Sequence, residues 1–390
     1  MPKALHRKTH HVHHRPLFEC IALLLQGGGA QGAYQAGVYE ALTEAGLHPD
    51  WVAGISIGAI NSALIAGNPP ERRVEKLRQF WEGITTETFA GLPQDFLKYV
   101  TKGDWARGLM SLMNAQTATV NGAPGFFAPR VPPPWAQPTG AVEATSFYST
   151  ATLKSTLEAL VDFDRINAQE MRFSVGAVNV RSGNFVYFDA ATHRIGPEHV
   201  MASGALPPGF PAVEIDGECY WDGGLVSNTP LQWVLDSTPR QDTLAFQVDL
   251  WCARGDFPGN LAEVETRRKE IQYSSRTRAS TDQFKYAQRI RNTVSRLLDS
   301  LPEDIRNSPD AGLLKSVADN KVYNIIHLIY RPDSYEGYSK DYEFSRCGME
   351  AHWRAGYHDT VRTLRHPDVL ERPINHEGVA IFDLERDGRE

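Results

Sequence analysis

A serine between two glycines is the first feature of this sequence that could do chemistry. Gly54-Ile-Ser56-Ile-Gly58 fits the pattern G-x-S-x-G, in which a tight strand-to-helix turn exposes a serine hydroxyl as a nucleophile. Residues 51–54 form a short apolar run that predicts a buried strand, and residues 59–65 continue as a helix. Because the motif also occurs by chance in glycine-rich βα turns, other features must support it.

A glycine loop follows an earlier predicted strand, residues 20–25, and precedes a predicted helix over 33–42. Gly27-Gly-Gly-Ala-Gln-Gly32 fits G-x-G-x-x-G, so a dinucleotide site must be considered. That site needs an acidic residue near the end of the second strand to bind the ribose. Asp50 precedes the second strand here, and the strand ends in Gly54-Ile-Ser56.

The alternative use of such a loop is to stabilise an anion. Backbone amides at a glycine turn and helix N-terminus can point at one developing oxyanion. Adjacent parallel strands would bring this loop and Ser56 to the same carboxyl edge of the sheet. A third polar group, Asp222, stands before Gly223-Gly224 at the end of a predicted strand, residues 218–221. Alone, Asp-Gly-Gly is often a plain turn.

In this order and spacing the three motifs resemble the patatin-like phospholipase family of bacterial type, over about residues 20–235. Residues 202–211, upstream of Asp222, are similar to another segment of that family. The resemblance implies that Ser56 is the nucleophile and Asp222 its catalytic partner. It implies an oxyanion hole made by the amides of Gly27, Gly28, Gly29 and Ile57. The supporting motif residues are Gln31, Gly32, Gly54, Gly58, Gly223 and Gly224.

The resemblance also implies an α/β fold of three layers, with a mixed central sheet flanked by helices and a mostly helical C-terminal extension. We expect a flexible His-rich tail over residues 1–18, a catalytic domain over 19–240 and the extension over 241–390. Within the extension, residues 243–250 and 321–330 are predicted strands that would complete the sheet. The extension lies outside the three motifs.

Two questions of mechanism follow. An aspartate with a reference pKa of ~3.9 is a weak base, so burial near Trp221 would have to raise the pKa of Asp222. Many relatives carry Arg or Lys where this chain has Gln31. The loss of that positive charge would weaken the electrostatic field at the oxyanion or favour less anionic substrates. A triad is the rival to the Ser-Asp dyad, because five histidines follow Asp222: His327, His352, His358, His366 and His376. We expect them to be surface or core residues.

Composition bounds the function. The net charge of −7 and pI near 6.0 argue against a nucleic-acid-binding protein. Four scattered cysteines indicate a reducing cytoplasm, and no apolar run approaches the ~20 residues that span a bilayer. Residues 17–25 imitate a signal peptide, but Glu19 interrupts them. We expect a cytoplasmic protein, with peripheral contact to the inner membrane as a variant, and neither metal nor cofactor.

Three regions are less defined. Residues 84–145 look irregular, and the Pro/Gly-rich stretch 119–142 holds Phe126, Phe127 and Trp135 as a cap, a membrane-touching flap or a solvated insertion. Residues 263–301 are helical, with an apolar stripe and many basic residues. They either pack on the core or lie on anionic lipid. A helix is predicted over 342–364, and the tail after Pro367 looks peripheral.

The leading hypothesis is a serine acylhydrolase of lipid esters, of phospholipase A or lysophospholipase type. A soluble carboxylesterase for short acyl or hydroxyacyl esters is the runner-up. A lipid-binding or regulatory protein with weak activity and a dinucleotide-binding oxidoreductase are the alternatives from other classes. The sequence leaves the oligomeric state open.

Overall fold

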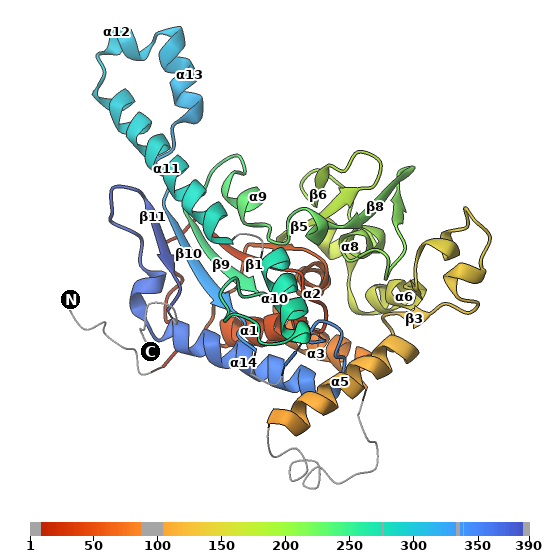
Figure 1. Cartoon of the computed structure of the whole chain (residues 1–390). Helices are drawn as coiled ribbons and strands as arrows, with labels where there is room; N and C mark the ends of the chain where they lie inside the picture. Colours follow the sequence, from red (N-terminus) through yellow and green to blue (C-terminus); the bar gives the residue numbers. More distant parts are fainter. Residues whose placement is uncertain (1–8, 87–103, 275–276, 333–335, 338, 385–390) are drawn as a thin grey trace.

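The computed structural model describes residues 9–86, 104–274, 277–332, 336–337 and 339–384 (Figure 1). The strands are β1 (Cys20–Leu25), β2 (Trp51–Gly54), β3 (Ala128–Pro129), β4 (Tyr148–Ser149), β5 (Arg172–Asn179), β6 (Phe185–Asp189), β7 (Val213–Ile215), β8 (Glu218–Asp222), β9 (Thr243–Asp249), β10 (Tyr323–Ile329) and β11 (Val379–Phe382). The helices are α1 (Ala33–Glu44), α2 (Ile57–Ala66), α3 (Arg73–Ile84), α5 (Asp104–Asn121), α6 (Ala151–Leu160), α7 (Phe163–Asn167), α8 (Pro197–Ser203), α9 (Leu231–Leu235), α10 (Leu261–Tyr273), α11 (Thr277–Ser300), α12 (Glu303–Arg306), α13 (Pro309–Val317) and α14 (Arg346–Leu364).

A mixed sheet forms the centre of the described chain. Its strands run in the order β11-β10-β9-β1-β2-β5-β8-β7, and β6 pairs with β5 outside this path. The strands from β11 to β5 are parallel to their neighbours, whereas β6, β7 and β8 are antiparallel. β9, β10 and β11 come from the C-terminal third, so one sheet runs across residue 240. The domain boundary that we place there stays a prediction.

Helices cover both faces of the sheet, as the alternating side chains of β1 demonstrate. Ile21, Leu23 and Leu25 belong to a core cluster shared with α1, α2, α3 and α14. Cys20, Ala22 and Leu24 belong to a second cluster, which includes apolar residues of α9 and α11. Because successive strand residues point to opposite faces, an all-apolar strand must be buried on both sides. The predicted three-layer α/β fold is therefore confirmed.

The bounds predicted for β1 and β2 are confirmed, but two regions differ from prediction. Within residues 84–145, which the sequence predicts to be less regular, α5 forms a helix of 18 residues. The tail after Pro367 is not peripheral, because β11 pairs with β10 and Val379 is buried. Residue Val12 also contacts the body, where its amide donates to the carbonyl of Ala45. A four-residue edge strand has too little periodicity to predict, since a distant partner fixes its place.

Two glycines let α1 and α14 pack closely. A Cβ on Gly37 would collide with the backbone of Trp353, and one on Gly356 would collide with the backbone of Tyr34. Trp353 is fully buried and its indole donates to Glu40 of α1. This contact holds the C-terminal helix against the layer that also carries α2 (Figure 1).

We predict that Gly37→Ala lowers the free energy of unfolding by about 2 kcal/mol, because the added methyl group must push α14 away. Gly83→Ala in α3 is the matched control, since nothing lies within 4 Å of its Cβ position. There the lower chain entropy of alanine should stabilise the protein by up to about 1 kcal/mol. Thermal or urea unfolding measures both. Equal effects of the two substitutions would contradict the packing argument.

Candidate active site

Ser56 occupies a strained turn between β2 and α2. Its φ of 55° and ψ of −124° lie where few non-glycine residues are found, at a cost of about 1–3 kcal/mol. The turn is tight because a Cβ on Gly54 would collide with the backbone of Gly58, and one on Gly58 would collide with the carbonyl of Leu25. The two motif glycines therefore permit the close approach that pushes the serine out at the end of the strand.

Asp222 reaches Ser56 because two strands share one edge of β5. β2 pairs in parallel with Arg172–Val175, and β8 pairs antiparallel with Ala177–Asn179. β6 covers residues 174–178 on the opposite edge. β2 and β8 therefore meet end to end along β5. The residues after β2 and the last residue of β8 lie at their junction.

The last residue of α8 and the segment that follows it fix the backbone of both residues. The amide of Ser56 donates to the carbonyl oxygen and to the hydroxyl of Ser203, each at 3.1 Å. The amide of Asp222 donates to the carbonyl of Ala205 at 3.0 Å. The Ser203 hydroxyl in turn donates to the carbonyl of Gly176 at 2.6 Å. This gives a physical role to the stretch 202–205, which was noted in the sequence only for its resemblance.

The carboxyl group of Asp222 is buried, with 2% of the residue exposed. It accepts a hydrogen bond from the amide of Gly224 at 2.7 Å, and the Ser56 side chain lies near enough to act on its pKa. Burial raises the pKa of Asp222 to about 6, and the Ser56 side chain and the Gly224 amide oppose this rise because they favour the charged form. The carboxylate is therefore a stronger base than an exposed aspartate.

The glycine loop is held by a buried asparagine that sequence reasoning missed. Asn228 accepts from the amide of Gly27 at 3.1 Å and donates to the carbonyl of the same residue at 3.0 Å. Its amide group also donates to the carbonyl of Tyr273. The Trp251 indole donates to the Gly27 carbonyl as well. Because the Gly27 amide is already used, it is not available to an anion in this arrangement.

The neighbouring amides differ. Within the described residues, the amides of Gly28, Gly29 and Ile57 donate to no protein acceptor. All three residues line the same cavity as Ser56. Gly29 has a φ of 57° and lies against the backbone of Asp341, where any side chain would collide. The C-terminal third thus shapes the loop from outside.

Gln31 lies away from this cavity. It is buried, and its side-chain amide donates to the carbonyl of Leu250 at 3.0 Å. The cation on the cavity wall comes from Lys269 of α10, which pairs with Asp341 at 2.9 Å. The predicted influence of Gln31 on the oxyanion therefore lacks a direct contact, whereas Lys269 was not singled out from the sequence.

Ser56 and Asp222 lie in a cavity of about 610 Å³. One wall is aromatic, with Phe126 and Phe127 packed against Phe210 and Phe344 at ring-centroid separations of 5.3–5.8 Å. Tyr148 extends this wall, with its ring 4.9 Å from that of Phe127. The Pro/Gly-rich stretch therefore caps the site through its two phenylalanines, whereas Trp135 is exposed. Such a lining suits an apolar chain.

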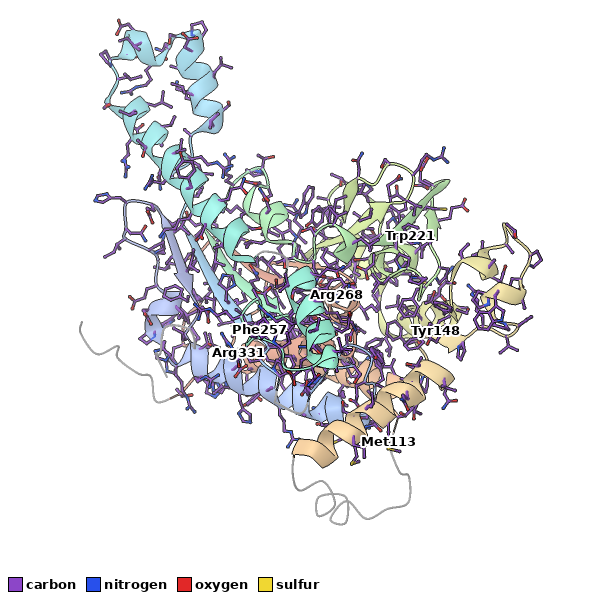
Figure 2. All side chains as sticks on the ribbon, in the orientation of Figure 1. Met113, Tyr148, Trp221, Phe257, Arg268 and Arg331 are labelled. Atoms are coloured by element: carbon purple, nitrogen blue, oxygen red, sulfur yellow. The ribbon has the colours of Figure 1, made fainter. Side chains whose placement is uncertain are left out.

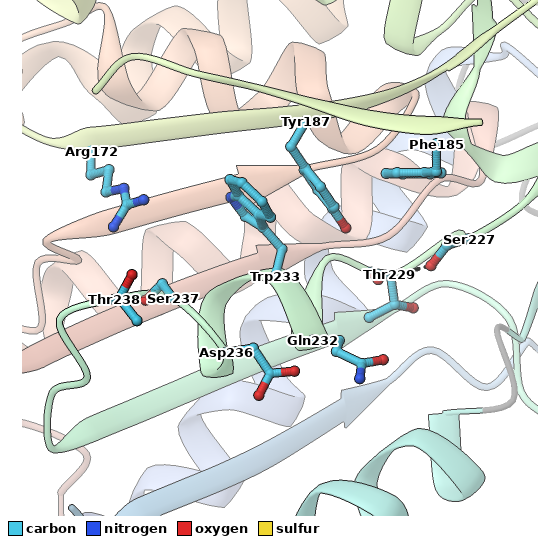
Figure 3. Close-up of a pocket in the computed structure, with 10 residues that line it drawn as sticks. All are labelled: Arg172, Phe185, Tyr187, Ser227, Thr229, Gln232, Trp233, Asp236, Ser237 and Thr238. Atoms are coloured by element: carbon cyan, nitrogen blue, oxygen red, sulfur yellow. Dashed lines mark hydrogen bonds between the residues drawn. The ribbon is translucent and has the colours of Figure 1, made fainter. Parts of the chain in front are cut away.

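A second cavity, of about 560 Å³, lies between β6 and α9 (Figure 3). Tyr187 and Trp233 stack on each other at its centre, with their ring centroids 4.5 Å apart. Arg172 and Asp236 add polar groups to its wall. None of the sequence-predicted site residues lines it, so we place the candidate active site in the first cavity.

The five histidines that follow Asp222 do not reach the first cavity. All are described by the structure, and none is among the residues that line it. His352 pairs with Glu336 in a buried contact, and His327 pairs with Asp249. His366 is also buried, and His376 is exposed. Across the described residues, no group of three or more His, Cys, Asp or Glu side chains is arranged to hold a metal ion.

Comparisons with known proteins identify the family of the chain. A family model described as patatin-like phospholipase matches residues 23–235, and a second, described as patatin phospholipase, matches residues 271–376. The first match covers more than half of the chain. The chain belongs to the patatin-like phospholipase family.

Individual relatives match over short stretches. Lysophospholipase nte1 of Aspergillus terreus is 47% identical over 57 residues, which is 15% of this chain and 4% of that protein. Patatin-like phospholipase domain-containing protein 7 of Mus musculus is 42% identical over 67 residues, 17% of this chain and 5% of that protein. The chain thus matches only about a twentieth of these relatives. Among solved structures, VipD from Legionella pneumophila aligns with 95% of this chain and 73% of its own, at 15% identity and a TM-score of 0.37.

None of the helices in the described ranges is long and apolar enough to cross a bilayer.

Folding stability should report the burial of Asp222. Its pKa is higher in the folded chain than in the unfolded chain, so its contribution to stability is complete below about pH 4 and is lost as the pH rises through about 6. We predict that Asp222→Asn raises the free energy of unfolding at pH 8, by up to about 3 kcal/mol, and has little effect near pH 4. Urea unfolding at both pH values tests this. A gain independent of pH would contradict a raised pKa.

Proposed function

We propose that the protein hydrolyses lipid esters, with Ser56 as nucleophile and Asp222 as its base. The observation that carries the proposal is that the Ser56 side chain and the buried Asp222 carboxylate interact on the wall of one largely apolar cavity. The family membership and the lysophospholipase among the relatives support the same class of reaction. The arrangement requires no histidine.

In acylation, the Ser56 oxygen attacks the ester carbonyl carbon while its proton passes to Asp222. The tetrahedral intermediate then collapses. The bond to the alcohol oxygen breaks, the alcohol takes the proton from Asp222, and an acyl-serine remains. In deacylation, a water gives its proton to Asp222, attacks the acyl carbon and releases the acid, and the proton returns to Ser56. Each step conserves the proton that the dyad shares.

The developing oxyanion would be stabilised by the amides of Gly28, Gly29 and Ile57, which have no competing acceptor among the described residues. Asn228 positions this loop through Gly27. Because these donors are backbone groups, the oxyanion does not require a charged side chain at position 31. The alternative of a lipid-binding or regulatory protein with weak activity, which Gln31 suggested, is therefore less well supported.

The walls of the cavity favour a substrate with an apolar acyl chain and a polar alcohol. The chain would lie along Phe126, Phe127 and Phe210, and the polar part near the Lys269–Asp341 pair. A short-chain carboxylesterase would not need the aromatic wall. A panel of esters of increasing chain length, beside phospholipid vesicles, separates these two substrate classes.

Substitution at the dyad should abolish turnover. We predict that Ser56→Ala and Asp222→Asn each lower kcat for a chromogenic ester by about 10³-fold or more, and that only the wild type and Asp222→Asn can be labelled by a fluorophosphonate, the latter slowly. His376→Ala, on the surface, is the control and should keep kcat within about twofold. A folded single variant of His327, His352, His358 or His366 that loses activity would replace the dyad with a triad.

The pH dependence of the reaction follows from the same carboxylate. Asp222 must be ionised to accept a proton, and burial raises its pKa to about 6. We predict that kcat/KM is constant above about pH 7 and falls about tenfold per pH unit below pH 6. An acidic limb near pH 4, where an exposed aspartate titrates, would show that Asp222 is not the base.

A further inference from the structure

Several apolar side chains of helix α10 point into solvent, and not toward the body of the protein. None of its 13 residues is buried. Leu261 is 85% exposed, Ile271 58% and Val264 42%, and Phe257 in the preceding turn is 95% exposed. Leu261, Val264 and Ile271 lie within about 80° of one another around the helix axis, so they form one outward face, on which the exposed Arg268 also lies. We call the four apolar residues the α10 outer face.

The opposite side of α10 is polar and faces the body of the protein. Lys269 pairs with Asp341 at 2.9 Å, and Glu270 pairs with Lys340 at 2.8 Å. Lys340 is buried, so the second pair lies inside the protein. The usual arrangement of an amphipathic helix, with apolar residues inward, is thus inverted here. Ion pairs and the ring of Tyr273, which packs against Trp251, hold the helix to the body, whereas Leu261, Val264 and Ile271 remain outside.

The start of α10 is stabilised locally, so its first turn does not depend on an apolar contact with the body. Asn260 caps it by accepting from the amide of Glu263, and the Glu263 carboxylate accepts from the Asn260 side chain and from the amide of Gly259. These contacts satisfy backbone donors that would otherwise be free. The helix therefore does not need its outer face for its own formation.

The position of α10 beside the cavity indicates which kind of partner would contact its outer face. Lys269 and Tyr273 line the cavity that holds Ser56, so the outer face belongs to a helix at the cavity wall. A lipid ester leaves a bilayer or micelle to reach that cavity. The exposed Arg268 pairs with Glu265 on α10, so its positive charge is balanced on the helix surface (Figure 2, where Phe257 and Arg268 are labelled). An apolar face with balanced charge suits a lipid surface more than an acidic or basic protein.

We propose that α10 is an interfacial helix, whose outer face of Phe257, Leu261, Val264 and Ile271 inserts into a lipid surface and holds the mouth of the Ser56 cavity against it. The proposal rests on the proposed function, since it supplies the surface from which a lipid ester would be drawn. The driving force is apolar burial, so binding to neutral phosphatidylcholine should suffice. Binding should also be nearly independent of salt.

The test separates binding from catalysis by using Ser56→Ala, which leaves the vesicles intact. Flotation with phosphatidylcholine vesicles compares Ser56→Ala alone with the same chain carrying Phe257→Ser and Leu261→Ser. We expect about tenfold weaker partitioning of the triple variant. The matched control carries Leu313→Ser and Val317→Ser on α13, which are 70% and 49% exposed and do not line the cavity; Figure 1 shows α13 well away from α10. The control should bind like Ser56→Ala.

With Ser56 intact, Phe257→Ser and Leu261→Ser should hydrolyse a short water-soluble ester at the wild-type rate and vesicle lipid about tenfold more slowly. Unchanged flotation, or an equal loss in the α13 control, would overturn the proposal. So would light scattering that finds a wild-type dimer which dissociates on Leu261→Ser, because the face would then join two copies. Ser56→Ala that still hydrolyses the soluble ester would refute the proposed function and leave the flotation result standing.

Discussion

The shared edge of β5 is the constraint on which the candidate site depends. A parallel and an antiparallel strand occupy that edge in succession, and only Gly176 separates the residues that they pair with. The junction admits little volume. A Cβ on Gly176 would collide with Phe185, and one on Gly223 would crowd the carbonyl of Gly176. These glycines keep the serine turn and the aspartate in contact, which side chains at either position would prevent.

Two features of the site lower the stability of the folded protein, and interactions in the surrounding sheet must offset them. Ser56 adopts a rare backbone conformation, and the Asp222 carboxylate lies out of water. Both features cost free energy of folding, and both make the pair reactive, since one exposes the hydroxyl and the other strengthens the base. Rigid neighbours compensate. Ser203 and Ala205 hold the two backbones, and Asn228 holds the loop, so that the strained geometry persists without a ligand.

The sequence was informative where short segments carry their own signal. The apolar runs of β1 and β2 predicted strands with the observed bounds, and the glycine motifs marked the turns that follow them. Asn228 and Asp341 had no such signal, because an isolated polar residue in a loop looks the same whether it is solvated or holds a distant backbone. The cavity walls were equally inaccessible. Phe127 and Phe344 are more than 200 residues apart and meet only through the fold. The inverted face of α10 required knowledge of which side the body occupies.

β1 lies in the middle of the sheet, with β2 of the N-terminal part on one side and β9 of the C-terminal third on the other. The first family match ends at residue 235, before β9 begins. A fragment cut at that point would leave the six apolar residues of β1 with a bare hydrogen-bonding edge, the kind of edge that pairs with other chains and aggregates. The serine and the aspartate thus lie on a sheet to which strands from both sides of residue 240 contribute. By pairing with β1, β9 covers the edge through which such a fragment would associate with other copies.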